Sequence, residues 1–165
     1  MPSVHVVTDS TADIPAHLAA ELGITVLPCI IAFGNEAYRD GLDLNNAEFY
    51  AKLATSKALP TTAHPPLGLF LETYAQLCRR GDAVFSIHIS AQLSGTMRTA
   101  IMAATALPDL PIRVVDSRQL SMGLGWQAII AARAAQRGCT LDEVCEQVAS
   151  ITQRVRAVAA LPSLW

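Results

Sequence analysis

Apolar runs of strand length alternate along the chain with stretches in which apolar residues recur at helical spacing. Strands are predicted at residues 4–8, 24–33, 83–89 and 112–115, with a short extension at 37–38. Helices are predicted at about 15–22, 45–53, 67–78, 95–104, 122–136 and 141–155, and Asn45/Glu48 and Thr140/Glu143 have capping-box spacing. Apolar strands that alternate with amphipathic helices predict an α/β fold, in which helices cover both faces of a mostly parallel sheet.

Composition and charge narrow the classes of partner. The 165 residues are 52% hydrophobic, which is ample for a buried core, and the formal net charge is −2. A basic excess that would neutralise phosphates is missing, so nucleic acid is not an expected partner. No apolar run approaches the roughly 20 residues of a transmembrane helix, and the first residues lack a signal-peptide pattern. We therefore expect a cytoplasmic protein.

The cysteines at positions 29, 78, 139 and 145 give no sign of chemistry. They form no Cys-x-x-Cys pair, and no histidine stands at metal-ligand spacing from them. Each lies among apolar residues, so we expect reduced, buried thiols and no metal site.

Hydroxyl-rich turns follow three of the predicted strands, at residues 9–11, 90–96 and 116–117. In open parallel sheets, ligands bind at the carboxyl ends of the strands, where these turns would meet. Residues 59–66 cannot be helical because prolines interrupt them. This predicted loop brings Thr61 and Thr62, which could fold over the same end of the sheet or be solvated residues of a rigid connector.

Ser94-Gly95-Thr96 opens a predicted helix, whose free N–H groups and dipole would attract an anion. For Ser94 alone a plain helix cap is the favoured role, whereas for the three residues together a cap and an anion site are about equally supported. Asp9 could be a general base or a cation ligand, but hydrogen bonding to the following turn is the favoured role. His88 and His64 have no partnered acid in the sequence pattern; His88 is predicted to be satisfied locally, and His64 to lie in a loop near the ligand.

Six motifs, in order and at matching intervals, resemble the signatures of the DegV family. They are residues 8–15 (TDSTADIP), 38–41 (YRDG), 60–65 (PTTAHP), 93–96 (LSGT), 116–118 (DSR) and 121–125 (SMGLG). The resemblance covers nearly the whole chain. It implies the α/β fold of the family's N-terminal domain for residues 1–156. Residues 157–165 would then begin a truncated connection to a second lobe that is absent from this chain.

The resemblance also implies a ligand, a long-chain fatty acid such as palmitate, whose tail lies in an apolar tunnel. The carboxylate would be held by Thr62 and Ser94. Supporting contacts are expected from Thr61, His64, Gly95, Thr96, Ser10 and Asp9. The protein would be a lipid carrier in lipid transport or fatty acid metabolism, without a cofactor or catalysis, and some relatives present the acyl group to a fatty acid kinase.

Two departures from the family pattern bear on this assignment. Ala63-His64 stands where the family has Ser-Gln, so the head-group hydrogen bonds are expected to differ, and His64 would add a donor whose charge varies with pH. Family members are also longer than this chain, and their second lobe contributes to the tunnel.

Two other functions remain open from the residues alone. The chain could be an enzyme that acts on a phosphorylated or carboxylated small metabolite, with Ser94, Gly95 and Thr96 holding the anion and Asp9 as the base. It could also be an interaction module whose apolar face pairs with a partner or with the expected second lobe.

Overall fold

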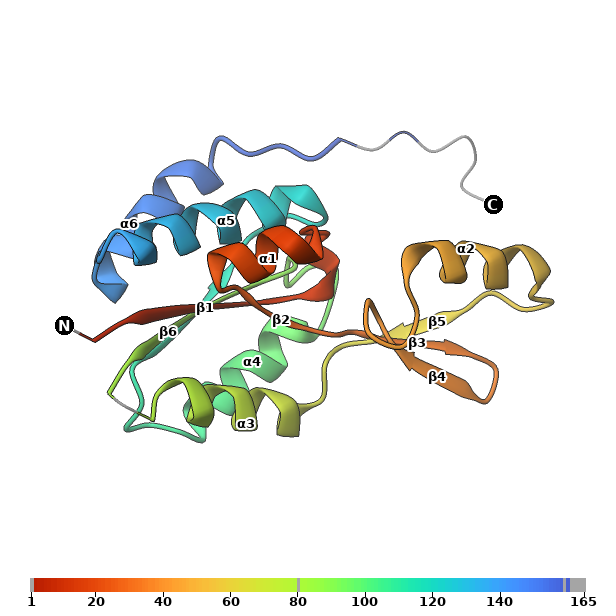
Figure 1. Ribbon diagram of the computed structural model, residues 1–165, viewed down its shortest axis with the longest axis horizontal. Coiled ribbons are helices and arrows are strands. Elements are labelled where there is room, and N and C mark those ends of the chain that lie inside the picture. The colour runs from red at the N-terminus through yellow and green to blue at the C-terminus, as the bar shows by residue number, and fades with distance from the viewer. Residues whose placement is uncertain (1, 80, 159, 161–165) are drawn as a thin grey trace.

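A four-stranded parallel sheet forms the centre of the molecule (Figure 1). The computed structural model describes residues 2–79, 81–158 and 160. The strands lie in the order β2-β1-β6-β7, and their bounds are Val4–Asp9 for β1, Thr25–Leu27 for β2, Ala83–His88 for β6 and Ile112–Asp116 for β7. Each neighbouring pair is parallel. The predicted α/β architecture is therefore confirmed.

Helices cover both faces of this sheet, as predicted. One face carries α1 (Ala16–Leu22), α5 (Met122–Gln136) and α6 (Leu141–Thr152), and the other carries α3 (Leu67–Leu77) and α4 (Thr96–Thr105) (Figure 1). Side chains alternate across a strand, so the central strand β1 feeds both cores. Val6 packs in the core beneath α5 and α6, whereas Val7 packs in the core beneath α3 and α4.

A small antiparallel sheet lies beside the main one. The sequence predicted its strand at 37–38 as a short extension, but not the sheet itself. Its order is β4-β3-β5, with β3 at Ile30–Phe33, β4 at Glu36–Arg39 and β5 at Thr61–Ala63, and α2 (Asn46–Thr55) packs on it. The single strand predicted at 24–33 is wrong because Pro28 has no N–H for a strand ladder. The chain leaves the parallel sheet there, and Cys29 N–H instead donates to Ser10 Oγ at 3.0 Å.

Several predicted element ends also shift. The predicted loop at 59–66 contains the strand β5, because Thr61–Ala63 pair with Ile30–Ala32 of β3. The helix after Ser94 begins at Thr96 with Gly95 at its N-cap, so Ser94 lies one position before the cap. Both predicted capping boxes, at Asn45 and Thr140, are confirmed. Helix α6 ends at Thr152, three residues before its predicted end.

Two further features are the residues after α6 and the state of the cysteines. Residues 155–158 and 160 form neither helix nor strand, and 159 and 161–165, within the predicted connection to a second lobe, lie outside the described residues. All four cysteines are free thiols, as predicted, but only Cys29 and Cys78 are buried as expected, whereas Cys139 and Cys145 are half-buried. Burial raises the pKa of Cys29 to about 11, so this thiol stays protonated at neutral pH.

Helix α5 approaches the chain after β1 closely enough to require glycine at position 125. A Cβ at Gly125 would overlap the carbonyl oxygen of Ala12, which belongs to the short 3-10 helix η1 (Ser10–Ala12). A Cβ at Gly68 in α3 would meet no atom within 4 Å.

The two glycines therefore form a matched pair for a stability test. Gly125→Ala should destabilise the fold by about 1–3 kcal/mol through overpacking against a backbone atom. Gly68→Ala should stabilise it by about 0.5–1 kcal/mol, because alanine favours helix. Urea unfolding of both variants measures the difference, and equal midpoints would contradict the close approach of α5 to η1.

Candidate functional site

Three turns meet at the carboxyl ends of β1, β6 and β7. The turn after β6 contacts the turn after β7 through the Ser90 N–H, which donates to the Gln119 carbonyl at 2.9 Å. The Ser117 N–H in turn donates to the His88 carbonyl at 3.1 Å. The hydroxyl-rich turns therefore gather at one edge of the sheet, as the strand order requires.

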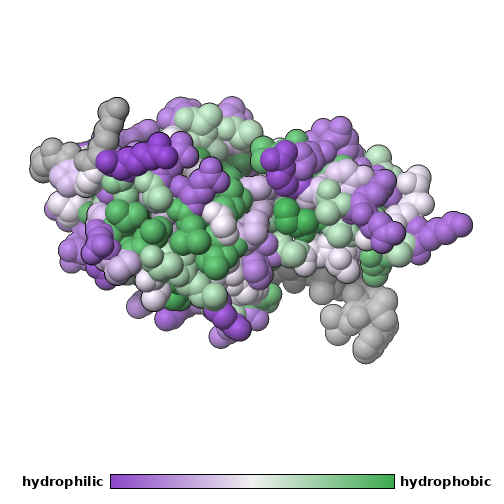
Figure 2. All heavy atoms as spheres, turned by 90° about the horizontal axis from the view of Figure 1, so that it is seen from below, coloured by the Kyte–Doolittle hydropathy of each residue, from purple (hydrophilic) through white to green (hydrophobic). Residues whose placement is uncertain are grey.

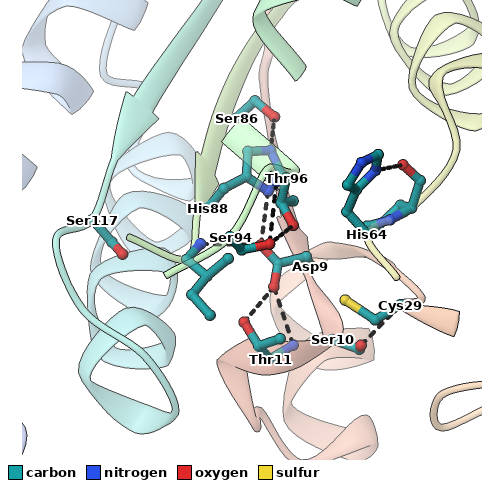
Figure 3. Close-up of polar contacts among 12 residues, drawn as sticks. Asp9, Ser10, Thr11, Cys29, His64, Ser86, His88, Ser94, Thr96 and Ser117 are labelled. Atoms are coloured by element: carbon teal, nitrogen blue, oxygen red, sulfur yellow. Dashed lines mark hydrogen bonds and ion pairs between the residues drawn. The ribbon is translucent and has the colours of Figure 1, made fainter. Parts of the chain in front are cut away.

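The Asp9 carboxylate joins the turn after β1 to the turn after β6 (Figure 3). Its Oδ1 accepts from the N–H of Thr11 at 3.1 Å and from the Thr11 hydroxyl. Its Oδ2 accepts from the N–H of Ile89 at 3.1 Å and lies 2.9 Å from Nδ1 of His88. The favoured role of Asp9, hydrogen bonding to its own turn, agrees with these contacts, and the carboxylate holds a second turn as well.

Asp9 remains ionised although its side chain is fully buried. Burial alone would raise the pKa of this carboxyl, but the interaction with His88 and the hydrogen bonds from Thr11 and Ile89 outweigh it and lower the pKa. Donors that surround the carboxylate replace the water that it gives up on folding.

A buried chain of hydrogen bonds continues from Asp9 into the core. His88 Nε2 lies 2.7 Å from Ser86 Oγ, which lies 2.7 Å from the Tyr74 hydroxyl. The expectation that His88 lacks a partnered acid is wrong, because β1 and β6 are neighbours and place His88 beside Asp9. Both residues stand at the ends of predicted strands, and that shared position was the signal that could have paired them.

The atoms of Ser86, His88 and Asp9 have the order of a serine nucleophile, its base and an orienting acid. Ser86 is fully buried, however, and its hydroxyl is already engaged with Tyr74. A substrate cannot reach it in this conformation. The constellation therefore organises the core and offers no nucleophile at the surface.

Ser94 is half-buried at the start of α4. Its hydrogen bonds with Thr96 determine whether its O–H is available to a ligand. Ser94 Oγ accepts from the Thr96 N–H at 3.2 Å and lies 2.9 Å from Thr96 Oγ1. Thr96 is fully buried, and within the described residues its hydroxyl has no other partner. An orphaned buried donor costs about 1–3 kcal/mol, so the Thr96 hydroxyl donates to Ser94. Both acceptor positions of Ser94 are thereby used, and its O–H is free to donate to a ligand.

His64 lies over the first turn of α4. A Cβ added at Gly95 would lie 3.2 Å from Cδ2 of His64, so the ring and this turn are in close contact. His64 Nδ1 is 3.1 Å from the Pro65 carbonyl oxygen and 3.4 Å from Thr99 Oγ1. Beside them opens a cavity of about 400 Å³, lined by His64, Leu67, Gly95, Arg98, Thr99 and Met102. The sequence pattern did not single out Arg98.

The remaining predicted site residues divide between the two sheets. Ser10 lies next to Asp9 and accepts from the Cys29 N–H. Thr61 and Thr62 lie on the exposed strand β5, and Thr62 pairs with Ile31. Within the described part of the chain the Thr62 hydroxyl makes no hydrogen bond, to Ser94 or to another residue. His64 provides the contact between this strand's end and α4.

Over residues 2–79, 81–158 and 160, no group of three His, Cys, Asp or Glu side chains could hold a metal ion. None of the helices in those ranges is sufficiently long and apolar to cross a membrane.

Comparison with known proteins places this arrangement in a family. The family model described as "Uncharacterised protein, DegV family" matches residues 3–164. The chain belongs to the DegV family. A DegV domain-containing protein of Clostridium perfringens is 34% identical over 99% of this chain and 59% of its own length. One from Streptomyces coelicolor is 39% identical over 85% of this chain and 50% of its own. The resemblance of the six motifs is thus confirmed.

Solved DegV structures share the fold. A DegV family protein from Thermus thermophilus, described by its fatty acid binding, has a TM-score of 0.84 at 32% identity and is matched over 92% of this chain and 54% of its own. DegV from Bacillus subtilis, described as a fatty acid binding protein, has a TM-score of 0.86 at 31% identity over 93% and 55%. This chain therefore spans little more than half the length of these DegV proteins.

The lowered pKa of Asp9 predicts a pH-dependent contribution to stability. A carboxyl whose pKa is below its unfolded value of 3.8 stabilises the fold above that pH, and the stabilisation is lost as the pH falls through the folded pKa. Asp9→Asn should cost about 1–3 kcal/mol at pH 7, because an amide mispairs with the surrounding donors. Urea unfolding of both proteins from pH 7 to pH 3 should show the difference shrinking below about pH 4. A difference that grows on acidification would contradict an ionised Asp9.

Proposed function

We propose that this chain takes part in binding a long-chain fatty acid, with the carboxylate at the start of α4. The free O–H of Ser94 carries the proposal, because it is a hydroxyl donor at a helix N-terminus in a chain whose structural relatives are described as fatty acid binding proteins. The ligand is a palmitate-like acid, and the protein acts as a carrier without catalysis.

The site offers several donors to a carboxylate. Ser94 supplies its hydroxyl, and the first turn of α4 adds free N–H groups and the positive end of its dipole. The His64 ring contacts the first turn of α4. Thr62 precedes His64 by two residues in the sequence and lies on the exposed strand β5. A bound ligand would bring Thr62 and Ser94 onto one carboxylate.

Apolar surface for the acyl tail begins beside these donors. Leu67 and Met102 line the cavity next to His64 and Gly95, and both are exposed. Figure 2 shows apolar side chains gathered on this side of the molecule, which α3 and α4 form. The relatives' additional length would cover the rest of the tail.

The binding free energies expected for the tail and for the head group of the ligand differ. Each buried CH₂ contributes about 0.8 kcal/mol, so a C16 tail offers roughly 10 kcal/mol before association costs. A charge-assisted hydrogen bond contributes about 1.5–3 kcal/mol. The tail therefore sets the affinity, and Thr62 and Ser94 set the position of the head group. An exposed head group suits presentation to a separate fatty acid kinase in the cytoplasm.

Purified protein should carry its ligand. Native mass spectrometry, followed by solvent extraction and lipid analysis, should show a C14–C18 fatty acid at near-stoichiometric amount. Folded protein without lipid, both as this chain and when extended to the length of its relatives, would contradict the carrier function. Lipid on the extended chain alone would assign the tail-binding surface to the added region.

Replacing the proposed donor tests the head-group site. Ser94→Ala should weaken palmitate binding about tenfold, the equivalent of about 1.4 kcal/mol, and should impair any use of the carboxylate by a kinase. Ser150→Ala makes the same chemical change on the exposed surface of α6 and should leave affinity unchanged. Affinity is measured by titration calorimetry with palmitate. A Ser94→Ala protein that binds and presents its ligand as well as the Ser150→Ala protein would exclude Ser94 from the site.

A further inference from the structure

In the buried chain of hydrogen bonds between Tyr74 and Asp9, each group donates to the next one toward Asp9. This order follows from matching every donor with an acceptor. Within the described residues, the Tyr74 hydroxyl has Ser86 as its hydrogen-bond partner. The Tyr74 proton must therefore go to Ser86, or it is buried without an acceptor. Ser86 then donates to Nε2 of His88. Nε2 is an acceptor, so a neutral His88 carries its proton on Nδ1 and donates it to Asp9.

A protonated His88 would leave one proton of this chain without an acceptor. Its Nε2–H would donate to Ser86, so Ser86 would either donate to Tyr74 and orphan the Tyr74 proton, or accept from both neighbours and orphan its own. With a neutral His88 the Asp9 carboxylate still accepts four hydrogen bonds, from Nδ1–H of His88, from the Ile89 N–H, and from the N–H and hydroxyl of Thr11. The contacts are thus satisfied together only when His88 is neutral with its proton on Nδ1.

The far end of this chain of hydrogen bonds reaches the proposed carboxylate site. Asp9 Oδ2 accepts from both His88 and the N–H of Ile89, which begins the turn that carries Ser94. The Ser94 N–H closes that turn by donating to the Ser90 carbonyl at 3.1 Å. The orientation of the Asp9 carboxylate therefore sets where the turn leaves β6.

We propose that His88 is a positioning residue for the fatty acid carboxylate. It acts through Asp9, because its Nδ1–H fixes the carboxylate that holds the turns bearing Thr11 and Ser94. The ligand does not touch His88, which is fully buried. This inference rests on the proposed function for its ligand, whereas the hydrogen-bond chain itself exists independently of any ligand.

Histidine NMR tests the chain directly on the unaltered protein. With ¹⁵N-labelled histidine, His88 should show a protonated Nδ1 and an unprotonated Nε2 at pH 7. The other three histidines are not fully buried and should exchange their ring protons with water. A proton on Nε2 of His88, alone or together with Nδ1, would overturn the proposal even if no variant folds.

Replacing His88 by asparagine or by glutamine distinguishes the roles of its two ring nitrogens. Asn places its side-chain N–H where Nδ1 stands and can still donate to Asp9, whereas Gln reaches the position of Nε2 and contacts Ser86 instead. His88→Asn should bind palmitate within about threefold of the unaltered protein, and His88→Gln should bind at least tenfold more weakly. His17→Gln, an exposed change on α1, is the matched control.

Hydrogen exchange provides a second measurement that needs no ligand. The Ile89 amide should exchange slowly in the unaltered protein and in His88→Asn, and at least tenfold faster in His88→Gln. Equal losses of affinity and protection in both variants would indicate a purely structural role and overturn the proposal. If the unaltered protein binds no palmitate, the proposed function fails, and the tautomer and the exchange rates still decide whether His88 fixes Asp9.

Discussion

The buried Asp9 carboxylate is the constraint on which the arrangement of this protein's site depends. A charge removed from water must be matched by donors, and here they come from the turn after β1, from the first residue after β6 and from His88. Because these donors belong to neighbouring parallel strands, satisfying one carboxylate fixes the relative position of two loops at the carboxyl ends of the strands. The buried Asp9 carboxylate therefore explains both the hydrogen bonds that surround it and the relative position of the two loops.

The accessibility of the polar groups supports the proposed carrier function. Among the described residues, Asp9, His88 and Ser86 resemble catalytic machinery, and burial closes this constellation to substrate. The accessible groups at the start of α4 are instead a hydroxyl donor, helix N–H groups and a histidine ring beside an apolar cavity. Such a set can orient a carboxylate and admit a hydrocarbon tail, and neither task requires a bond to break.

The periodicity of the sequence predicted the elements that depend on neighbouring residues. It did not predict the strand pairing and side-chain contacts between residues far apart in the sequence. The parallel sheet, its covering helices and both capping boxes were predictable, because their signals lie within a few residues of each other. The antiparallel sheet was not, since β5 is only three residues long and pairs with β3 about thirty residues away. The contact of Asp9 with His88 spans 79 residues and follows from strand order, which a single sequence does not display.

The position of Ser94 shows a further limit. The sequence left a helix cap and an anion site about equally open. The structure places Gly95 at the N-cap, and the buried Thr96 hydroxyl occupies one acceptor position of Ser94, which a single sequence does not display. A crystal structure of the protein with palmitate would show directly where the head group binds. The carboxylate should lie within hydrogen-bond distance of Ser94 Oγ at the start of α4, with Asp9 still bound to Ile89. A carboxylate bound elsewhere, with Ser94 unengaged, would contradict the proposed site.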